Sequence, residues 1–217
     1  MNKNIHDHRI LILDFGSQVT QLIARRVREI GVYCELWAWD VTEEQIREFK
    51  PNGIILSGGP ESVTEAGSPR APQYVFEAGV PVMGICYGMQ YLAKVFGGEI
   101  ASADVREYGH TKIEFQQHPL FAGMGDVVWM NHNDSVTRAP EGFREIAATQ
   151  NCPVAAFAND DKKMYGIQFH AEVTHTVNGQ KLFENFLKLI CALRCDYNAA
   201  NLKDELIAQI RAQVGDK

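Results

Sequence analysis

Short apolar runs alternate with segments of helical periodicity along the first half of the chain, and this alternation limits the fold more than any other feature. The predicted strands are 9–14, 32–37, 53–57 and 80–85, and the predicted helices are 19–30, 42–49, 71–78 and 88–96. Strands separated by helices pair in parallel, because the crossover helix returns the chain to the edge where the previous strand began. The sequence therefore predicts an α/β fold in which helices cover both faces of a mostly parallel sheet.

The second half of the chain has a different pattern, with short strand-like pieces between Pro, Gly, Asn and Asp turns. We expect these pieces to extend the same sheet in antiparallel fashion: 112–115, 127–130, 145–149, 154–157 and 164–169. Two further helices are predicted, at 179–191 and 201–214. We expect residues 1–195 to form one domain and residues 196–217 a C-terminal helical segment. An apolar stripe on that segment either packs on the core or contacts another domain: Leu202, Leu206, Ile207, Ile210 and Val214.

Charge and cysteine usage exclude several classes of protein. The formal net charge is −6 over 217 residues, which argues against binding to the phosphates of nucleic acid. No apolar run approaches the length of a membrane span, and the polar start of the chain has no signal-peptide core. The five cysteines are widely spaced and odd in number, so we expect reduced thiols and a cytoplasmic protein.

The segment Gly84-Ile85-Cys86-Tyr87-Gly88 joins an apolar strand to a helix and places a cysteine on the turn. This spacing is typical of a nucleophile elbow, a turn so tight that side chains two residues before and two after the nucleophile would collide. The N-terminus of the following helix favours a thiolate. The pattern therefore predicts Cys86 as a nucleophile, and the alternative is a buried structural cysteine.

A thiol nucleophile needs a base, an orienting carboxylate and donors for the oxyanion. His170 and Glu172 follow a predicted strand, and strand alternation sends them to the same side. Gly58 and Gly59 follow a buried strand at the same sheet edge, where bare N–H groups could face an oxyanion together with the amide of Tyr87. Taken alone, such a histidine is more often a surface or turn residue, and such glycines more often form an ordinary turn. The catalytic interpretation of both therefore depends on the nucleophile elbow at Cys86.

Signatures for nucleotide and metal sites are incomplete. The glycine spacing in 53–58 is not followed by the lysine of a P-loop. His170-Ala171-Glu172 lacks the Pro-Cys-x-x-Cys segment that completes a zinc deaminase site. We therefore predict no metal and no cofactor in this chain.

On these motifs the chain resembles the class I, triad-type glutamine amidotransferases, and within them the glutaminase domains of GMP synthetases. The matching segments are Ile12-Leu-Asp-Phe-Gly-Ser-Gln18, Gly53-Ile-Ile-Leu-Ser-Gly-Gly-Pro-Glu-Ser62, Gly84-Ile-Cys-Tyr-Gly-Met-Gln90 and Gly166-Ile-Gln-Phe-His-Ala-Glu-Val-Thr-His-Thr176. The resemblance implies the amidotransferase fold and hydrolysis of L-glutamine to glutamate and ammonia through a cysteine thioester. It also implies that the ammonia serves to aminate XMP to GMP.

The resemblance further implies roles for particular residues. Cys86 is expected to be the nucleophile, His170 the general base and then the acid, and Glu172 its orienting partner. Gly59 and Tyr87 are expected to supply the oxyanion N–H groups. The residues expected to bind glutamine, some of them in a pocket loop at 131–134, are Gly58, Gln90, Asn133 and Asp134.

Two positions depart from the family pattern. Ala171 stands where the family almost always has proline, which would leave the position of His170 less rigid. Asn133 stands where glycine is common, and this replacement is tolerable if the residue has a positive φ, because asparagine is the next best choice there. Two alternatives therefore stay open: a glutaminase for another acceptor, and a catalytically weakened binding or regulatory module. Glu-Val-Thr-His-Thr argues against the first, and the intact triad against the second.

GMP synthetases also contain an ATP pyrophosphatase domain with a Ser-Gly-Gly-x-Asp-Ser loop, which this sequence lacks. We expect such a synthetase domain as the partner, either in the same protein or as a separate subunit. ATP and Mg²⁺ are expected only in that partner. For this chain we expect L-glutamine as the small-molecule substrate, with no nucleic acid and no membrane as partner.

Overall fold

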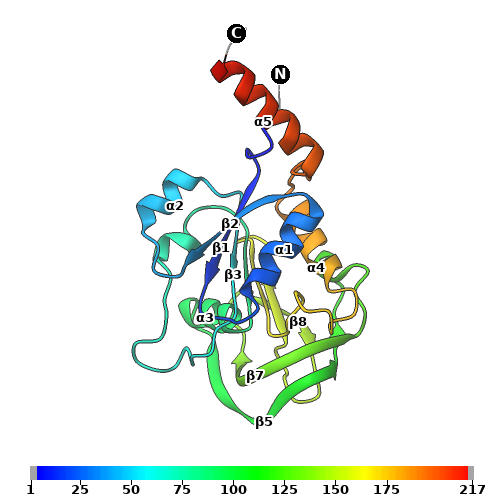
Figure 1. The fold of residues 1–217 in the computed structure, drawn as a ribbon. Helices are drawn as coiled ribbons and strands as arrows, with labels where there is room; N and C mark the ends of the chain where they lie inside the picture. Colours follow the sequence, from blue (N-terminus) through cyan, green and yellow to red (C-terminus); the bar gives the residue numbers. More distant parts are fainter. Residues whose placement is uncertain (1–3, 215–217) are drawn as a thin grey trace.

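The computed structural model describes residues 4–214 and is built around an eight-stranded sheet of order β2-β1-β3-β4-β10-β9-β8-β6 (Figure 1). The parallel part contains β2 (Tyr33–Ala38), β1 (Arg9–Asp14), β3 (Gly53–Leu56), β4 (Val82–Ile85) and β10 (Met164–Ile167). The antiparallel part contains β9 (Ala156–Asn159), β8 (Arg144–Ala148) and β6 (Glu114–Phe115). The predicted parallel sheet with an antiparallel extension is confirmed.

Helices cover both faces of the sheet, as predicted. They are α1 (Thr20–Ile30), α2 (Glu43–Phe49), α3 (Tyr87–Val95) and α4 (Gln180–Asn185). On one face Ile10 and Ile12 of β1 belong to the apolar cluster that includes α1 and α4. On the other face Leu11 and Leu13 belong to the cluster that includes α2 and α3. Because side chains of a strand point alternately to the two faces, a strand covered on both sides must be apolar throughout.

Local signals set the ends of the helices. The Thr42 side chain accepts from the N–H of Gln45 and the Gln45 side chain accepts from the N–H of Thr42, a capping box that starts α2. The predicted helix at 71–78 is wrong in extent, because the structure has only a 3₁₀ turn, η1 (Gln73–Phe76). Pro72 precedes this turn and Gly79, with φ 73°, follows it closely, which leaves too few residues for an α-helix.

β5 (Glu99–Lys112) and β7 (Val127–Arg138) form a separate two-stranded antiparallel sheet, seen below the main sheet in Figure 1. The expectation that all strands of the second half extend one sheet is therefore wrong for this pair. The predicted strand 127–130 continues to residue 138, and the predicted strand 112–115 is divided between β5 and β6. The two long strands satisfy each other's backbone groups, so polar residues that favour a turn locally stay extended.

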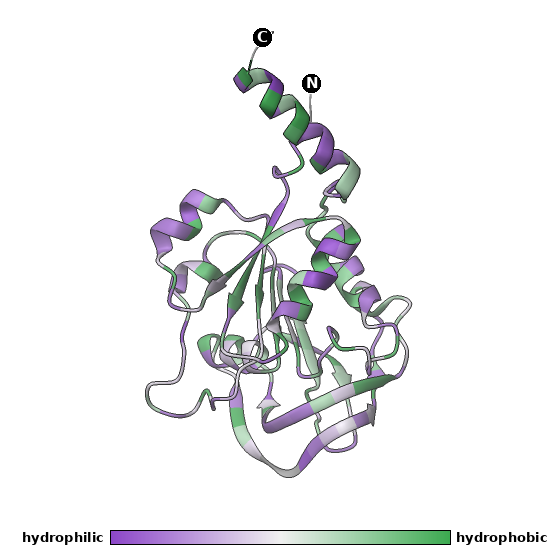
Figure 2. Cartoon of the chain, viewed as in Figure 1, coloured by the Kyte–Doolittle hydropathy of each residue, from purple (hydrophilic) through white to green (hydrophobic). Residues whose placement is uncertain are grey.

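The C-terminal part leaves the sheet. The predicted helix 179–191 is α4 followed by a π-helical segment, η3 (Phe186–Ile190). α5 (Ala199–Val214) extends away from the sheet, and none of its residues is buried (Figures 1 and 2). Of the apolar stripe, Leu206, Ile210 and Val214 are 48%, 58% and 55% exposed, whereas Leu202 and Ile207 are partly buried. Residues 215–217 of the predicted segment lie outside the described residues. Within 4–214, no helix combines the length and the apolar character needed to cross a bilayer.

Candidate active site

Cys86 lies on the turn between β4 and α3, with φ 53° and ψ −108°. This backbone conformation is strained for a residue with a side chain, so the surrounding structure must hold it. A Cβ on Gly84 would lie 2.4 Å from the carbonyl carbon of Gly88, and a Cβ on Gly88 would lie 2.4 Å from the Leu56 carbonyl oxygen. The two glycines therefore permit the tight strand-to-helix turn that their spacing predicts.

His170 and Glu172 form a buried pair, with 2.7 Å between Nδ1 and Oε1. β10 ends at Ile167, so strand alternation is not what places the two side chains together. Instead the His170 N–H donates to the Trp129 carbonyl of β7 at 2.9 Å, and the Thr176 hydroxyl donates to the His170 carbonyl. An isolated bridge to the second sheet therefore holds the histidine in place.

The protonation of His170 follows from its neighbours. Burial disfavours the charged imidazole, but the Glu172 carboxylate and hydrogen bonds to Cys86 and Glu172 outweigh it and raise the pKa of His170 well above its usual value. An imidazolium beside a cysteine sulfur favours the thiolate. The geometry can therefore support a thiolate–imidazolium pair.

Polar groups surround the Cys86 sulfur. Gln168 Nε2 lies 3.6 Å from it, and the Asn131 carbonyl oxygen lies 3.7 Å from it. A Cβ on Gly58 would lie 3.3 Å from Cε1 of His170 and 3.6 Å from Cβ of Cys86, so Gly58 borders both side chains. The structure thus brings the predicted nucleophile, base and orienting carboxylate into one site.

Gly59 and Tyr87 border the same cavity as Cys86. Tyr87 is the first residue of α3, so its N–H has no partner inside the helix. A Cβ on Gly59 would lie 2.5 Å from the Phe15 carbonyl oxygen, so the chain fits here only with glycine. Among residues 4–214, no acceptor takes a hydrogen bond from either N–H, which leaves both available to an oxyanion.

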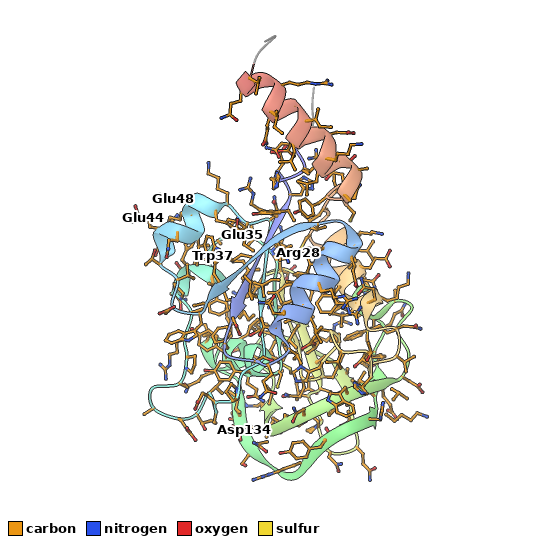
Figure 3. The ribbon with its side chains drawn as sticks, viewed as in Figure 1. Arg28, Glu35, Trp37, Glu44, Glu48 and Asp134 are labelled. Atoms are coloured by element: carbon orange, nitrogen blue, oxygen red, sulfur yellow. The ribbon has the colours of Figure 1, made fainter. Side chains whose placement is uncertain are left out.

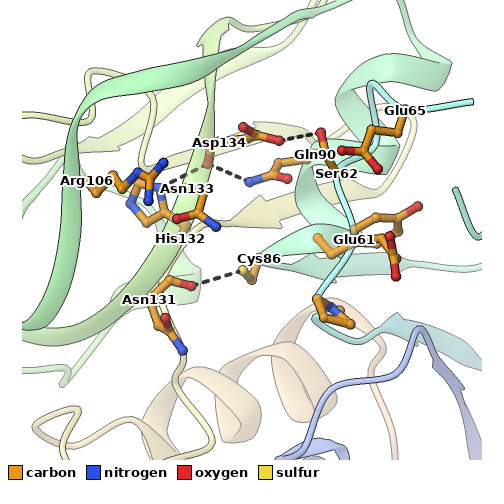
Figure 4. Close-up of a pocket in the computed structure, with 13 residues that line it drawn as sticks. Glu61, Ser62, Glu65, Cys86, Gln90, Arg106, Asn131, His132, Asn133 and Asp134 are labelled. Carbon is orange, nitrogen blue, oxygen red and sulfur yellow. Dashed lines mark hydrogen bonds between the residues drawn. The ribbon is translucent and has the colours of Figure 1, made fainter.

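The cavity in front of Cys86 has a volume of about 360 Å³ (Figure 4). The lining residues come from the loop after β3, from α3, from β5 and from β7, and include Glu61, Ser62, Glu65, Gln90, Arg106 and 131–134. The Ser62 hydroxyl donates to the Asp134 carboxylate, and Gln90 Nε2 donates to the Asp134 carbonyl oxygen at 2.7 Å. The predicted pocket residues Gln90, Asn133 and Asp134 therefore share one cavity with the cysteine. Figure 3 places Asp134 at the end of the molecule opposite α5.

Asn133 lies within β7 and does not have a positive φ, so it needs no glycine-like backbone freedom. β5 pairs with the residues on both sides of Asn133, which keeps its backbone extended. The Tyr108 hydroxyl, from β5, donates to the Asn133 side-chain oxygen. Residues 131–134 therefore border the pocket as part of a strand and not as the predicted loop.

Several residues of the site were not predicted from the sequence, among them Ser62, Glu65, Arg106 and Gln168. For Gln168 a signal exists in the sequence, because it is a polar residue between Ile167 and Phe169 in an otherwise apolar segment, and the structure buries it fully. Ser62 and Arg106 lie in polar stretches, where nothing in the sequence separates them from ordinary surface residues.

Glu107, His132 and Cys152 are the described residues that offer a group of metal ligands, with ligand atoms within 4.8 Å of one another. Hydrogen bonds already occupy the carboxylate, since the Thr149 hydroxyl donates to one oxygen at 2.7 Å and His132 Nε2 lies 3.3 Å from the other. Burial and the Glu107 charge raise the pKa of Cys152 to about 12, which opposes the thiolate that a metal would need. We therefore interpret this cluster as a hydrogen-bonded one.

Comparisons with known proteins show what the chain is similar to. A family model described as glutamine amidotransferase class-I matches residues 11–190. A glutamine-hydrolyzing GMP synthase from Aeromonas hydrophila is 59% identical and covers 100% of this chain. A solved structure from Thermoplasma acidophilum, provisionally described as one of the subunits of a GMP synthase, is 33% identical with a TM-score of 0.77, covering 85% of this chain and 94% of that one. A glutamine amidotransferase from Thermotoga maritima, 22% identical with a TM-score of 0.65 over 76% of each chain, shares the fold.

The length of the match differs between these relatives. The chain spans less than half the length of the curated relatives it matches, 44% of the protein from Aeromonas hydrophila and 43% of that from Aeromonas salmonicida. By contrast, it spans nearly all of the Thermoplasma acidophilum chain.

Proposed function

Because this chain belongs to the class-I glutamine amidotransferase family, we propose that it hydrolyses the side-chain amide of L-glutamine to glutamate and ammonia. The observation that carries the proposal is the position of Cys86, on a strained turn beside the buried His170–Glu172 pair. A nucleophile, a base and an orienting carboxylate are the groups that acyl transfer by a thiol requires.

In the first half of the reaction, the Cys86 thiolate attacks the side-chain carbonyl carbon of bound glutamine. The carbonyl oxygen becomes an oxyanion, which the N–H groups of Gly59 and Tyr87 stabilise. His170 then gives its Nε2 proton to the leaving nitrogen. Ammonia departs, and a glutamyl thioester remains on Cys86.

In the second half, a water molecule attacks the thioester carbon while His170 accepts a proton from it. The carbon–sulfur bond breaks, glutamate is released and the Cys86 thiolate is restored. Glu172 holds Nδ1 of His170 through the 2.7 Å hydrogen bond, which keeps Nε2 directed at the reacting atoms throughout.

The pocket carries charges of both signs, as recognition of an amino acid requires. Glu65 and Asp134 are placed to attract the α-ammonium of glutamine, and Arg106 its α-carboxylate. The amide nitrogen of Gln90 donates hydrogen bonds to the Asp134 carbonyl oxygen and to Oε1 of Gln168. The side-chain oxygen of Gln90 can therefore accept a hydrogen bond from the substrate.

We extend the proposal to the use of the ammonia. The relatives named GMP synthase support amination of XMP to GMP by an ATP-consuming synthetase domain, either joined to this chain in one protein or present as a separate subunit. ATP and Mg²⁺ would be bound by that domain, and this chain would supply ammonia.

Glutamate release from glutamine tests the first part, measured on the chain and on Cys86→Ala. Loss of release in the variant supports the proposal, and undiminished release contradicts it. The second part is tested by adding a synthetase domain with XMP, ATP and Mg²⁺ and measuring GMP. If glutamate release increases only with a synthetase domain that aminates a different acceptor, and not with the one that aminates XMP, the ammonia has a different use.

A further inference from the structure

A continuous series of hydrogen bonds leads from the Cys86 sulfur into the wall of the pocket. Gln168 Nε2 donates to the sulfur at 3.6 Å, and Gln168 Oε1 accepts from Gln90 Nε2 at 3.2 Å. The same Gln90 nitrogen donates to the Asp134 carbonyl oxygen at 2.7 Å. Gln168 is fully buried and Gln90 is 4% exposed, so water does not compete for these bonds.

The series continues behind the pocket into the buried cluster of β5 and β7. His132 Nδ1 lies 3.0 Å from the Asp134 carbonyl oxygen, and its Nε2 lies 3.3 Å from Glu107 Oε2. The other Glu107 oxygen accepts from the Thr149 hydroxyl at 2.7 Å. His132 and Glu107 are each 5% exposed, and the proposed reaction gives neither a role.

The chemistry of the end groups fixes the direction of every bond in the series. A backbone carbonyl can only accept, so the Asp134 oxygen must face the amide nitrogen of Gln90 and a protonated Nδ1 of His132. The Gln90 nitrogen must then face Oε1 of Gln168, which leaves the Gln168 nitrogen toward the sulfur. One carbonyl therefore sets the orientation of two side-chain amides.

Glu107 completes this arrangement. With Nδ1 facing the Asp134 carbonyl, the other ring nitrogen of His132, Nε2, faces Oε2 of Glu107 at 3.3 Å. Glu107 thus holds the ring, and the ring holds the Asp134 carbonyl.

We propose that Gln168 is a catalytic residue that stabilises the Cys86 thiolate with its amide N–H, and that Glu107 and His132 are positioning residues that orient it through Asp134 and Gln90. The inference rests on the proposed role of Cys86 as the nucleophile. A thiol can donate to the Asn131 carbonyl, 3.7 Å away, but a thiolate needs donors. Gln168 supplies one in addition to His170.

The test follows alkylation of Cys86 by iodoacetamide against pH, in the full chain, by mass spectrometry of the peptide that contains Cys86. This readout needs no glutamine turnover. Gln168→Met keeps the length of the side chain and removes the donor. Since a hydrogen bond to a charged group is involved, we expect the pH midpoint of alkylation to rise by about one unit, which is about tenfold slower labelling below the midpoint.

The positioning part is tested with a pair of changes at Glu107. Glu107→Leu removes the hydrogen-bond partner of His132 Nε2 and should raise the midpoint, whereas Glu107→Gln retains a polar side chain of the same length and should leave the midpoint near that of the wild type. In the double variant Glu107→Leu/Gln168→Met the shift should not exceed that of Gln168→Met, because both changes break the same series. Cys152→Ala is the matched control, since it disturbs the same buried cluster outside the series and should lower the melting temperature without moving the midpoint.

Three results separate the possible failures. An unchanged midpoint in Gln168→Met overturns the inference even if Glu107→Leu does not fold. Shifts that add in the double variant overturn the positioning role of Glu107 and His132. Glutamine hydrolysis that survives in Cys86→Ala overturns the proposed function itself, and this result does not depend on the alkylation profile.

Discussion

Cys86 differs from the other cysteines in its backbone and in its neighbours. Burial raises the pKa of Cys34 to about 11 and, with the Glu107 charge, that of Cys152 to about 12, so these thiols stay protonated. Burial also raises the pKa of Cys191 and of Cys195. Cys86 instead lies beside His170 on a strained turn.

We predict that Cys86 is the one cysteine of the five whose loss abolishes glutamine hydrolysis. Cys86→Ala should reduce glutamate release to background, because a covalent thioester can no longer form. Alanine at the other four positions should leave the rate per folded molecule unchanged. Labelling by a reactive glutamine analogue checks the same point, and labelling that persists in Cys86→Ala would contradict it.

The raised pKa of His170 makes part of the stability depend on pH. A histidine whose pKa in the folded state lies above its usual value of 6.5 stabilises the fold fully below that pH and loses this contribution as pH rises through the folded value. The wild type should therefore exceed His170→Gln in free energy of unfolding most at a pH below 6.5, and this difference should shrink as the pH rises above 6.5. Urea titrations at a series of pH values measure it, and an excess that grows with pH would disprove the assignment.

Ala171 occupies a place where proline should fit. His170 before it is in an extended bridge, as a residue before proline must be, and the Ala171 N–H makes no hydrogen bond to any described residue. Ala171→Pro should raise the free energy of unfolding by about 0.4–1 kcal/mol and raise the rate of glutamine hydrolysis. Chemical denaturation and glutamate release measure both. A variant that is less stable and less active would show that proline does not fit the backbone here.

At the scale of elements, the contact between the elbow and β3 depends on Gly88. A Cβ on Gly88 would lie 2.4 Å from the carbonyl oxygen of Leu56 and 2.7 Å from the Leu56 Cβ. Because the carbonyl belongs to the backbone of β3, it cannot move away without displacing the strand. Gly88→Ala should therefore destabilise the protein by at least about 3 kcal/mol, measured by urea unfolding.

Gly79 is a control that separates the steric clash at Gly88 from the cost of placing a side chain on a backbone with positive φ. Gly79 has φ 73°, and a Cβ added to it would meet no atom within 4 Å, so Gly79→Ala meets only the backbone penalty of about 1–2 kcal/mol. If Gly88→Ala and Gly79→Ala lower the free energy of unfolding by the same amount, α3 can shift away from β3 to relieve the clash.

At the scale of the whole molecule, α5 has no buried residue, and its apolar residues Leu206, Ile210 and Val214 are about half exposed. Figure 3 places it at the end opposite Asp134, so α5 lies away from the pocket that Asp134 lines. The division into a domain at 1–195 and a helical segment at 196–217 stays a prediction.

We predict that the chain alone hydrolyses glutamine slowly and that a synthetase domain supplied with XMP and ATP raises the rate. Leu206→Ser/Ile210→Ser should abolish this increase while the free energy of unfolding changes by less than about 0.5 kcal/mol per site, because both residues are already exposed. Leu189→Ser, at a residue 59% exposed in η3, is the control and should leave the increase intact. A lone chain as fast as the mixture would disprove gating by a partner.

The sequence by itself determined the features that neighbouring residues encode. The apolar runs 9–14, 53–57 and 80–85 indicate buried parallel strands, since each position must be apolar when both faces are covered. The spacing of Gly84, Cys86 and Gly88 indicates the elbow, because the collision that it avoids involves residues four apart. These constraints are local, so they can be inferred before the fold is known.

Only the tertiary structure decided what depends on residues far apart in the chain. The backbone of Asn133 is extended because β5 pairs with β7, and His170 is held by a bridge to Trp129 and not by its own strand. The bond between Gln90 and Gln168 joins residues 78 positions apart. No local propensity records such contacts, because the free energy that selects them comes from packing and from the need to pair every buried polar group.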